Sequence, residues 1–225
     1  MGNAVGQLLP IAIGIAVSPL PIVAVVLMLA TPRGRANGPA FVLAWVVGLA
    51  VVTTVVVLLA GDDATDDAGA PATWVSWVKL LLGLGLLAIG VRQWMHRPRG
   101  DEVAELPTWM RALDDFTWPK AAGAGLVLSA ANPKNLLLAV AGGAVIAQSG
   151  LSAGAEAGTI AIFVAIATIG VAAPVVVSLA MGSRSRAVLD ELRDWMARNN
   201  ATIMAVLLLV IGIKLIGDAI SGFSA

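Results

Sequence analysis

Two segments, Ser18-Pro19-Leu20-Pro21 and Asn132-Pro133-Lys134-Asn135, each interrupt a long apolar stretch of the chain. Proline has no backbone N–H group, and its ring clashes with the preceding helical turn. In lipid no water replaces the lost hydrogen bond, so the carbonyl groups freed at such a break must face protein or a wet cavity. Two broken helices at matching places are typical of a transport site at a repeat interface.

The composition indicates an integral membrane protein. Of the 225 residues, 59% are hydrophobic and 12% are charged, which is more apolar than soluble globular domains. Cysteine is absent, so disulfides and thiolate metal sites are excluded. The single histidine, His96, lies among arginines, and we expect no metal site and no cofactor. We also expect no enzymatic activity and no catalytic residue, because no hydrolase elbow, phosphate loop or His/Glu metal cluster is present.

Six apolar stretches are long enough to cross a bilayer, which takes ~20 helical residues. They cover residues 4–30, 36–61, 74–91, 121–154, 157–183 and 199–222. The sequence therefore predicts an all-α membrane protein with six transmembrane helices, of which the first and fourth are broken. We expect residues 1–225 to form a single transmembrane domain.

The connections between these stretches alternate in charge. The second and fourth contain no lysine or arginine, whereas the first, third and fifth contain arginines such as Arg33, Arg99 and Arg186. The positive-inside rule places the arginine-bearing connections in the cytoplasm. Both termini are then extracytoplasmic, and the protein is expected in the bacterial inner membrane. The expected aromatic belts are Trp74 and Trp77 outside, and Trp94 and Trp118 inside.

Two of the cytoplasmic connections have an amphipathic pattern. Apolar residues fall on one helical face in residues 103–116 and again in residues 186–198. The pattern fits helices that lie on the inner membrane surface. It fits equally well helices that pack beneath the transmembrane bundle.

The halves of the chain resemble each other. Gly90-Val91-Arg92 matches Gly212-Ile213-Lys214, Gly48 aligns with Gly170, and the two prolines at the breaks align. Three spans per half is an odd number, which predicts an inverted-topology repeat. The expected limits are 4–96 for repeat one, 97–119 for a cytoplasmic connection and 120–222 for repeat two. Chance similarity between apolar segments is the alternative.

Lys134 is the candidate with the clearest chemistry. It follows Lys120 by 14 residues, roughly 20 Å along a helix, and so lies near mid-membrane. Lysine at that depth costs ~2.5–3.5 kcal/mol on insertion scales, and no acidic residue lies within spans one to five. We expect Lys134 to face a wet cavity, freed carbonyl groups or an anionic group of a cargo. The structural alternative is that it only caps carbonyl groups released by Pro133.

Other residues near the breaks complete the candidate site. The predicted substrate-binding residues are Lys134, Asn132, Asn135 and Ser18, and the predicted helix-breaking residues are Pro19, Pro21 and Pro133. Lys214 and Asp218 in span six are expected to pair at i,i+4 and are a weak candidate for coupling to an ion. Glycines in the spans are expected to allow close helix packing; they are Gly48, Gly83, Gly85, Gly142, Gly143 and Gly170.

At these residues the chain resembles the LysE superfamily of six-span exporters. The matching features are the proline-bearing first span, the Trp45-Val46-Val47-Gly48 run and Asn132-Pro133-Lys134. Within that superfamily it looks most like the GAP family, the peptidoglycolipid-addressing or sulfolipid-addressing proteins of mycobacteria and related actinobacteria. Amino-acid exporters of the superfamily carry Pro-Gly-Pro in the first span, where this chain has Ser18-Pro19-Leu20-Pro21.

The resemblance implies the export of a cell-envelope glycolipid or its precursor across the inner membrane. It implies membrane lipid as a partner, a homodimer, and work beside a larger lipid transporter. The alternatives are an accessory subunit of such a transporter with no transport of its own, and an exporter of a small, amino-acid-like solute. No nucleic-acid partner is expected.

Overall fold

The structure is a computed structural model that describes residues 1–60, 73–95 and 116–223. Every element in these ranges is helical. The elements are α1 (Gly2–Ala16), α2 (Pro19–Ala30), α3 (Gly34–Ala60), α4 (Thr73–Met95), α5 (Trp118–Leu126), a π-helical turn η3 (Val127–Ala131), α6 (Pro133–Ala147), α7 (Ala153–Met181), a 3-10 turn η4 (Gly182–Arg184) and α8 (Ser185–Phe223). The predicted all-α fold is confirmed.

Both predicted helix breaks are present. The chain bends by 50° between α1 and α2, and by 60° between the α5–η3 segment and α6. Pro19 begins α2 and Pro133 begins α6, where a missing N–H group costs nothing. The residues before them, Ser18 and Asn132, are extended because proline disfavours the helical conformation of its predecessor.

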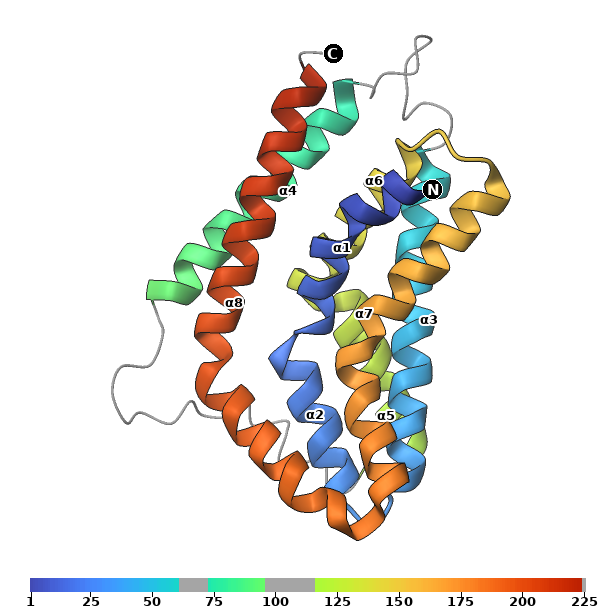
Figure 1. Cartoon of the computed structure of the whole chain (residues 1–225), viewed down its shortest axis with the longest axis vertical. Coiled ribbons are helices and arrows are strands. Elements are labelled where there is room, and N and C mark those ends of the chain that lie inside the picture. Colours follow the sequence, from blue (N-terminus) through green and yellow to red (C-terminus); the bar gives the residue numbers. More distant parts are fainter. Residues whose placement is uncertain (61–72, 96–115, 224–225) are drawn as a thin grey trace.

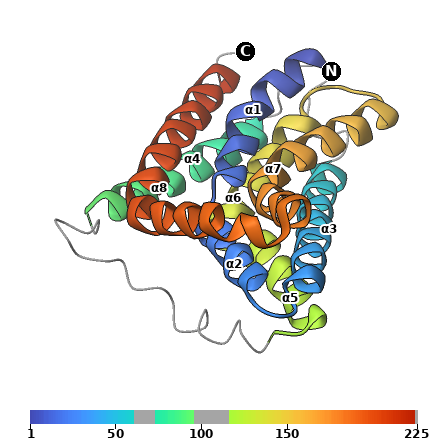
Figure 2. The ribbon, with the colours of Figure 1, turned by 60° about the horizontal axis from the view of Figure 1, so that its bottom comes forward.

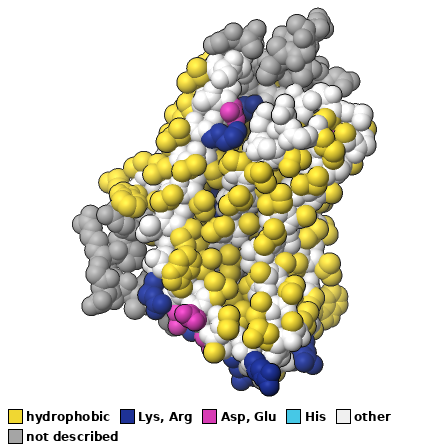
Figure 3. Space-filling view, viewed as in Figure 1, with side chains coloured by type: hydrophobic (Ala, Val, Ile, Leu, Met, Phe, Trp, Pro, Cys, Tyr) yellow, Lys and Arg dark blue, Asp and Glu magenta, His cyan; other side chains and the backbone are white. Residues whose placement is uncertain are grey.

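The helices have the lengths of a multi-pass membrane protein. Among the described residues, α3, α4, α7 and α8 are long and apolar enough to cross a membrane, and the number rises to six if each bent pair is one span. Large apolar side chains such as Leu58, Leu59 and Leu81 are exposed on the surface. Figure 3 shows that hydrophobic side chains cover most of the middle of one face. Such a surface contacts lipid.

The bundle has a main body and a lateral pair of helices. In Figure 1, α1–α2, α3, α5–α6 and α7 lie together, while α4 and α8 pair closely beside them. Both chain ends lie at the same end of the molecule (Figure 1). Arg35 of the α2–α3 region and Arg186 at the start of α8 line the same pocket, so these two segments lie at one end of the bundle. Figure 3 shows basic side chains gathered at the end away from the N-terminus.

The amphipathic segment 186–198 is the first part of α8 rather than a separate helix. Figure 2 shows that this part crosses the end of the bundle. Leu189 and Met196 are buried in the main hydrophobic core, whereas Val188 and Trp195 stay exposed. The segment therefore packs beneath the bundle, which is the second of the two predicted arrangements. The other amphipathic segment, 103–116, lies almost entirely outside the described residues.

Two glycines allow the broken helices to approach the long ones. A methyl group at Gly170 of α7 would overlap the carbonyl oxygen of Ala16, just before the first break. A methyl group at Gly48 of α3 would overlap Oγ of Ser129, just before the second break. Gly48 and Gly170 hold corresponding positions in the predicted repeat, which itself stays a prediction.

The other glycines differ in their roles. The ideal Cβ position of Gly83 lies 2.9 Å from the carbonyl oxygen of Gly212, so α4 and α8 touch at their backbones. Gly142 packs closely against the side chain of Phe163, and Gly143 packs closely against the side chain of Val56. An ideal Cβ atom on Gly85 would meet no neighbouring atom within 4 Å. Its predicted role in close helix packing is therefore wrong. The helix α7 continues through Pro174.

Substitution of Gly170 with alanine tests the close approach of α7 to the first break. The obstacle is a backbone carbonyl, which cannot rotate away, so we expect Gly170→Ala to destabilise the fold by about 1–3 kcal/mol. Thermal unfolding in detergent measures the change. Gly85→Ala is the matched control, since it also replaces a helical glycine but meets nothing within 4 Å. Equal melting temperatures for both variants would contradict the assigned contact.

Candidate functional site

The two helix breaks meet inside the bundle. The hydroxyl Oγ of Ser18 donates a hydrogen bond to Oδ1 of Asn135 at 3.4 Å, and both side chains are buried. These residues are separated by more than half of the chain, and each lies at a proline break. The structure therefore brings together two of the predicted site residues that the sequence could only place on separate helices.

The first break frees the carbonyl group of Gly14. In a continuous helix this carbonyl would accept the N–H of Ser18, but that N–H bonds to the carbonyl of Ile15 at 3.1 Å. The ammonium nitrogen Nζ of Lys134 instead donates to the carbonyl oxygen of Gly14 at 2.8 Å. A lysine from the second break thus satisfies a carbonyl freed at the first.

The second break is capped by its own asparagines. The N–H of Asn132 reaches back to the carbonyl of Val127 at 3.0 Å, a π-type bond that leaves Leu128 without its helical partner. The amide Nδ2 of Asn135 donates to the carbonyl oxygen of Leu128 at 2.9 Å. Oδ1 of Asn132 accepts the N–H of Lys134 at 3.1 Å, as in an N-cap.

Lys134 is held between α1, α6 and α8. Its side chain is only 6% exposed, and besides the Gly14 carbonyl its Nζ lies 3.8 Å from the sulfur of Met204 on α8. No carboxylate of the described residues forms an ion pair with it. Lys134 is predicted to face a wet cavity, freed carbonyl groups or an anionic group of a cargo. The structure shows a freed carbonyl group, and among the described residues the amine contacts neutral groups only.

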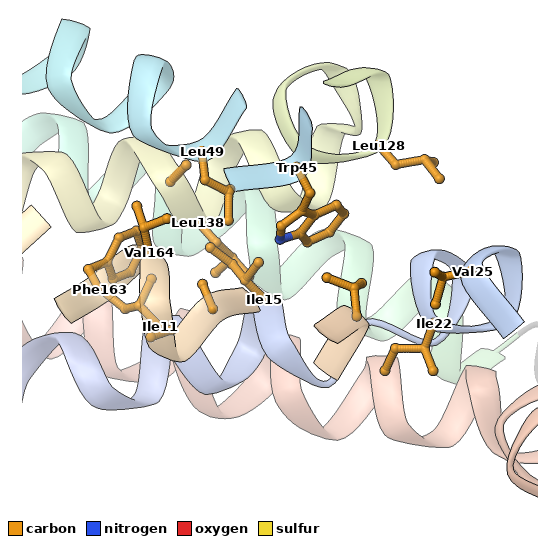
Figure 4. Close-up of a cluster of buried hydrophobic side chains, with 14 of the residues drawn as sticks. Ile11, Ile15, Ile22, Val25, Trp45, Leu49, Leu128, Leu138, Phe163 and Val164 are labelled. Atoms are coloured by element: carbon orange, nitrogen blue, oxygen red, sulfur yellow. The ribbon is translucent and has the colours of Figure 1, made fainter. Parts of the chain in front are cut away.

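The walls around the breaks are apolar. Figure 4 shows Ile15, Trp45 and Leu138 grouped where α1, α3 and α6 converge. Trp45 is fully buried, and its indole Nε1 has no hydrogen-bond partner among the residues that the structure describes. A buried unpaired donor is uncommon in proteins and marks a place where a polar ligand or a water can bind.

The predicted coupling pair lies elsewhere. Nζ of Lys214 and Oδ2 of Asp218 are 2.6 Å apart, so the predicted i,i+4 pair is confirmed. Lys214 follows Met204 by ten residues, about 15 Å along α8. Lys214 and Asp218 are therefore remote from the Lys134 amine, and the structure does not join them to the candidate substrate site.

Two open spaces of the described residues lie away from Lys134. A groove between α3 and α7 has a volume of about 720 Å³ and an apolar lining that includes Ala50, Ala157 and Ala161. A pocket of about 480 Å³ at the basic end is lined by Arg35, Ser178 and Arg186. Lys134 lines neither of them.

Sequence reasoning missed the partners of Lys134. Gly14 acts through its backbone carbonyl, which every residue has, and Met204 is one apolar residue among many in α8. The only signal for Gly14 is its place four residues before Ser18, because a proline break frees the carbonyls of the preceding turn.

Removal of the Asn135 amide tests the capping network. We expect Asn135→Leu to lower stability by about 1–3 kcal/mol, because the carbonyl of Leu128 would be buried without a partner. Thermal unfolding in detergent measures this loss. Ser18→Ala should cost less, since its hydrogen bond is long at 3.4 Å. A larger loss for Ser18→Ala than for Asn135→Leu would contradict the network as described.

Comparison with known proteins agrees with this architecture. A family model described as Sap, sulfolipid-1-addressing protein, matches residues 8–221. No curated protein and no solved structure matches the chain. The relation to the wider LysE superfamily stays a prediction. Since the matched range includes both helix breaks and Lys134, the chain belongs to the sulfolipid-1-addressing protein family.

Proposed function

We propose that the protein is a secondary exporter in the bacterial inner membrane, with a cell-envelope glycolipid or its precursor as cargo. The cargo is anionic or amphipathic and binds between spans one and four. Its contacts are Lys134, Asn132, Asn135 and Ser18 at the two breaks. The proposal includes no enzymatic step.

The buried amine of Lys134 carries this proposal. Its partners are one carbonyl and one thioether, so no described group neutralises its positive charge. A negatively charged headgroup would offset the cost of burying the ammonium group. Lys134 of α6 bonds to the Gly14 carbonyl of α1, and exchange of that carbonyl for a cargo oxygen would break this link between the two helices.

The family description supports an anionic lipid as cargo. A sulfolipid carries a sulfur-containing acid group beside its acyl chains, and it therefore combines a negative charge with a large apolar surface. The groove between α3 and α7 offers an apolar surface on which acyl chains can lie. The amine at the breaks offers a positive charge for the headgroup.

A second candidate is an accessory subunit that assists a larger lipid transporter without moving lipid itself. The low exposure of Lys134, at 6%, favours this function, because neither the α3–α7 groove nor the pocket at the basic end is lined by it. In that case the network across the breaks is a structural clamp. A homodimer is compatible with either function.

Variants of Lys134 separate the cargo site from the clamp. Lys134→Gln keeps a side-chain donor for the Gly14 carbonyl but removes the positive charge. If the charge holds the cargo, export should fall roughly 10- to 100-fold, the equivalent of ~1.5–3 kcal/mol for a lost charged hydrogen bond. Lys134→Arg should be impaired too, because a planar guanidinium does not replace a compact ammonium group. Transport of a labelled sulfated glycolipid by the purified protein in liposomes is the measurement.

Melting curves of the same variants provide the control. Lys134→Met removes charge and donor together, so it should lower the melting temperature, whereas Lys134→Gln should preserve more of it. A stable Lys134→Gln protein with full export would refute the cargo site. A wild-type protein that moves no cargo until a larger transporter is added would favour the accessory role.

The proposed orientation places both termini outside the cell. The arginine-bearing α2–α3 connection and the start of α8 share one end of the bundle, and Figure 1 places both chain ends at the other. The positive-inside rule assigns the arginine-rich end to the cytoplasm.

Thiol labelling tests this orientation in a chain that has no cysteine of its own. Asn3 and Arg186 are both exposed. We expect a membrane-impermeant thiol reagent to label an Asn3→Cys variant in intact cells, and an Arg186→Cys variant only after permeabilisation. The opposite pattern would reverse the proposed topology.

A further inference from the structure

The buried face of α4 presents two polar groups that the described residues leave unsatisfied. Ser76 is 1% exposed, and its Oγ has no hydrogen-bond partner. Lys79 is 6% exposed, and no described residue accepts a hydrogen bond from its amine. The two residues are three positions apart, so they lie next to each other on one side of the helix. Unsatisfied buried polar groups require an explanation, and an absent ligand is one.

Lys79 lies near the ion pair on α8. Lys79 interacts electrostatically with both Asp218 and Lys214, and Lys214 already holds the carboxylate of Asp218 at 2.6 Å. Lys79 is in none of the ion pairs of the described residues, so its ammonium group has no carboxylate of its own there. Close packing of Gly83 against Gly212 fixes α4 and α8 beside this cluster.

The cluster lies near the end of the bundle that holds both termini. Lys79 is six residues after the start of α4, and Asp218 is five residues before the end of α8. Each is thus within roughly 10 Å of its helix end, a depth that a lipid headgroup can reach and a mid-membrane site does not have. Figure 3 shows a spot of positive and negative side chains in the upper part of the face, above its apolar middle.

We propose that Ser76, Lys79, Lys214 and Asp218 form a second site, one that binds a phosphate or sulfate group. Asp218 holds Lys214 in position, and Lys79 supplies the charge that the anion neutralises. The Ser76 hydroxyl donates a hydrogen bond to an anion oxygen. Ammonium and hydroxyl donors on neighbouring helices are a common combination for such anions. The site is separate from the breaks and does not depend on the proposed cargo at Lys134.

The experiment measures thermal unfolding of the purified full chain in lipid nanodiscs. The neutral reference is phosphatidylcholine, one arm replaces part of it with phosphatidylglycerol, and a second arm adds sodium sulfate to the neutral discs at constant ionic strength. A ligand that binds only the folded protein raises its melting temperature. We expect a rise of several degrees in the wild type. A rise with phosphatidylglycerol alone identifies a lipid headgroup, and a rise with sulfate as well identifies a free anion.

Variants connect the rise to the proposed site. Lys79→Gln should lose more than half of the rise, and Ser76→Ala a smaller part. Lys120→Gln is the matched control, because it removes an exposed lysine from α5, outside the proposed site, and it should keep the full rise. Lys79→Arg should keep most of it, since the charge remains.

Two results would overturn the site. One is an equal rise in the wild type and in Lys79→Gln. The other is a melting temperature for Lys79→Gln that is lowered by the same amount in every lipid, which would show that Lys79 only locks α4 to α8. If Lys79→Gln does not fold, Ser76→Ala decides the question, and an undiminished rise in that variant refutes the proposal.

Discussion

The need to satisfy backbone carbonyl groups in lipid governs the centre of this protein. Each proline break removes a backbone donor in a region that water does not reach. A carbonyl group freed at the first break, that of Gly14, accepts its hydrogen bond from Lys134 of the second break. Asn135 adds a bond to Leu128 and accepts one from Ser18. The breaks are therefore one joint structure, which fixes α1 against α6.

The helices α3 and α7 pack closely against this junction. Gly170 and Gly48 let α7 and α3 lie directly against the turns that precede the breaks. Trp45, Ile15 and Leu138 belong to the buried hydrophobic core of the bundle (Figure 4). Polar interactions are stronger in such a setting, and groups without partners are costlier. In this setting one amine links α1 to α6 through the Gly14 carbonyl.

Basic side chains also occur at several positions along the length of the bundle. Arg35 and Arg186 line a pocket at one end, Lys134 lies at the helix breaks, and Lys79 lies beside the Lys214–Asp218 pair toward the other end. Positively charged groups at successive depths are a physical basis for stabilising an anionic headgroup as it crosses. This reading rests on the proposed function, and the acidic partner Asp218 limits the net charge at the far end to a single unit.

The sequence alone determined the fold class, the number of apolar stretches and the location of both breaks, because each depends on local chemistry: hydrophobic length for spans, and a missing N–H group for breaks. It also predicted the Lys214–Asp218 pair, which is a local i,i+4 contact. It could not show which carbonyl Lys134 would satisfy, or that Lys79 is buried beside the Lys214–Asp218 pair, since these arrangements join helices distant in the chain. Gly85 illustrates the same limit: its sequence context resembles that of Gly83, yet only Gly83 meets a backbone partner. The tertiary structure decided these points because helix rotation and crossing geometry, which no local pattern encodes, select the face of each helix that meets another.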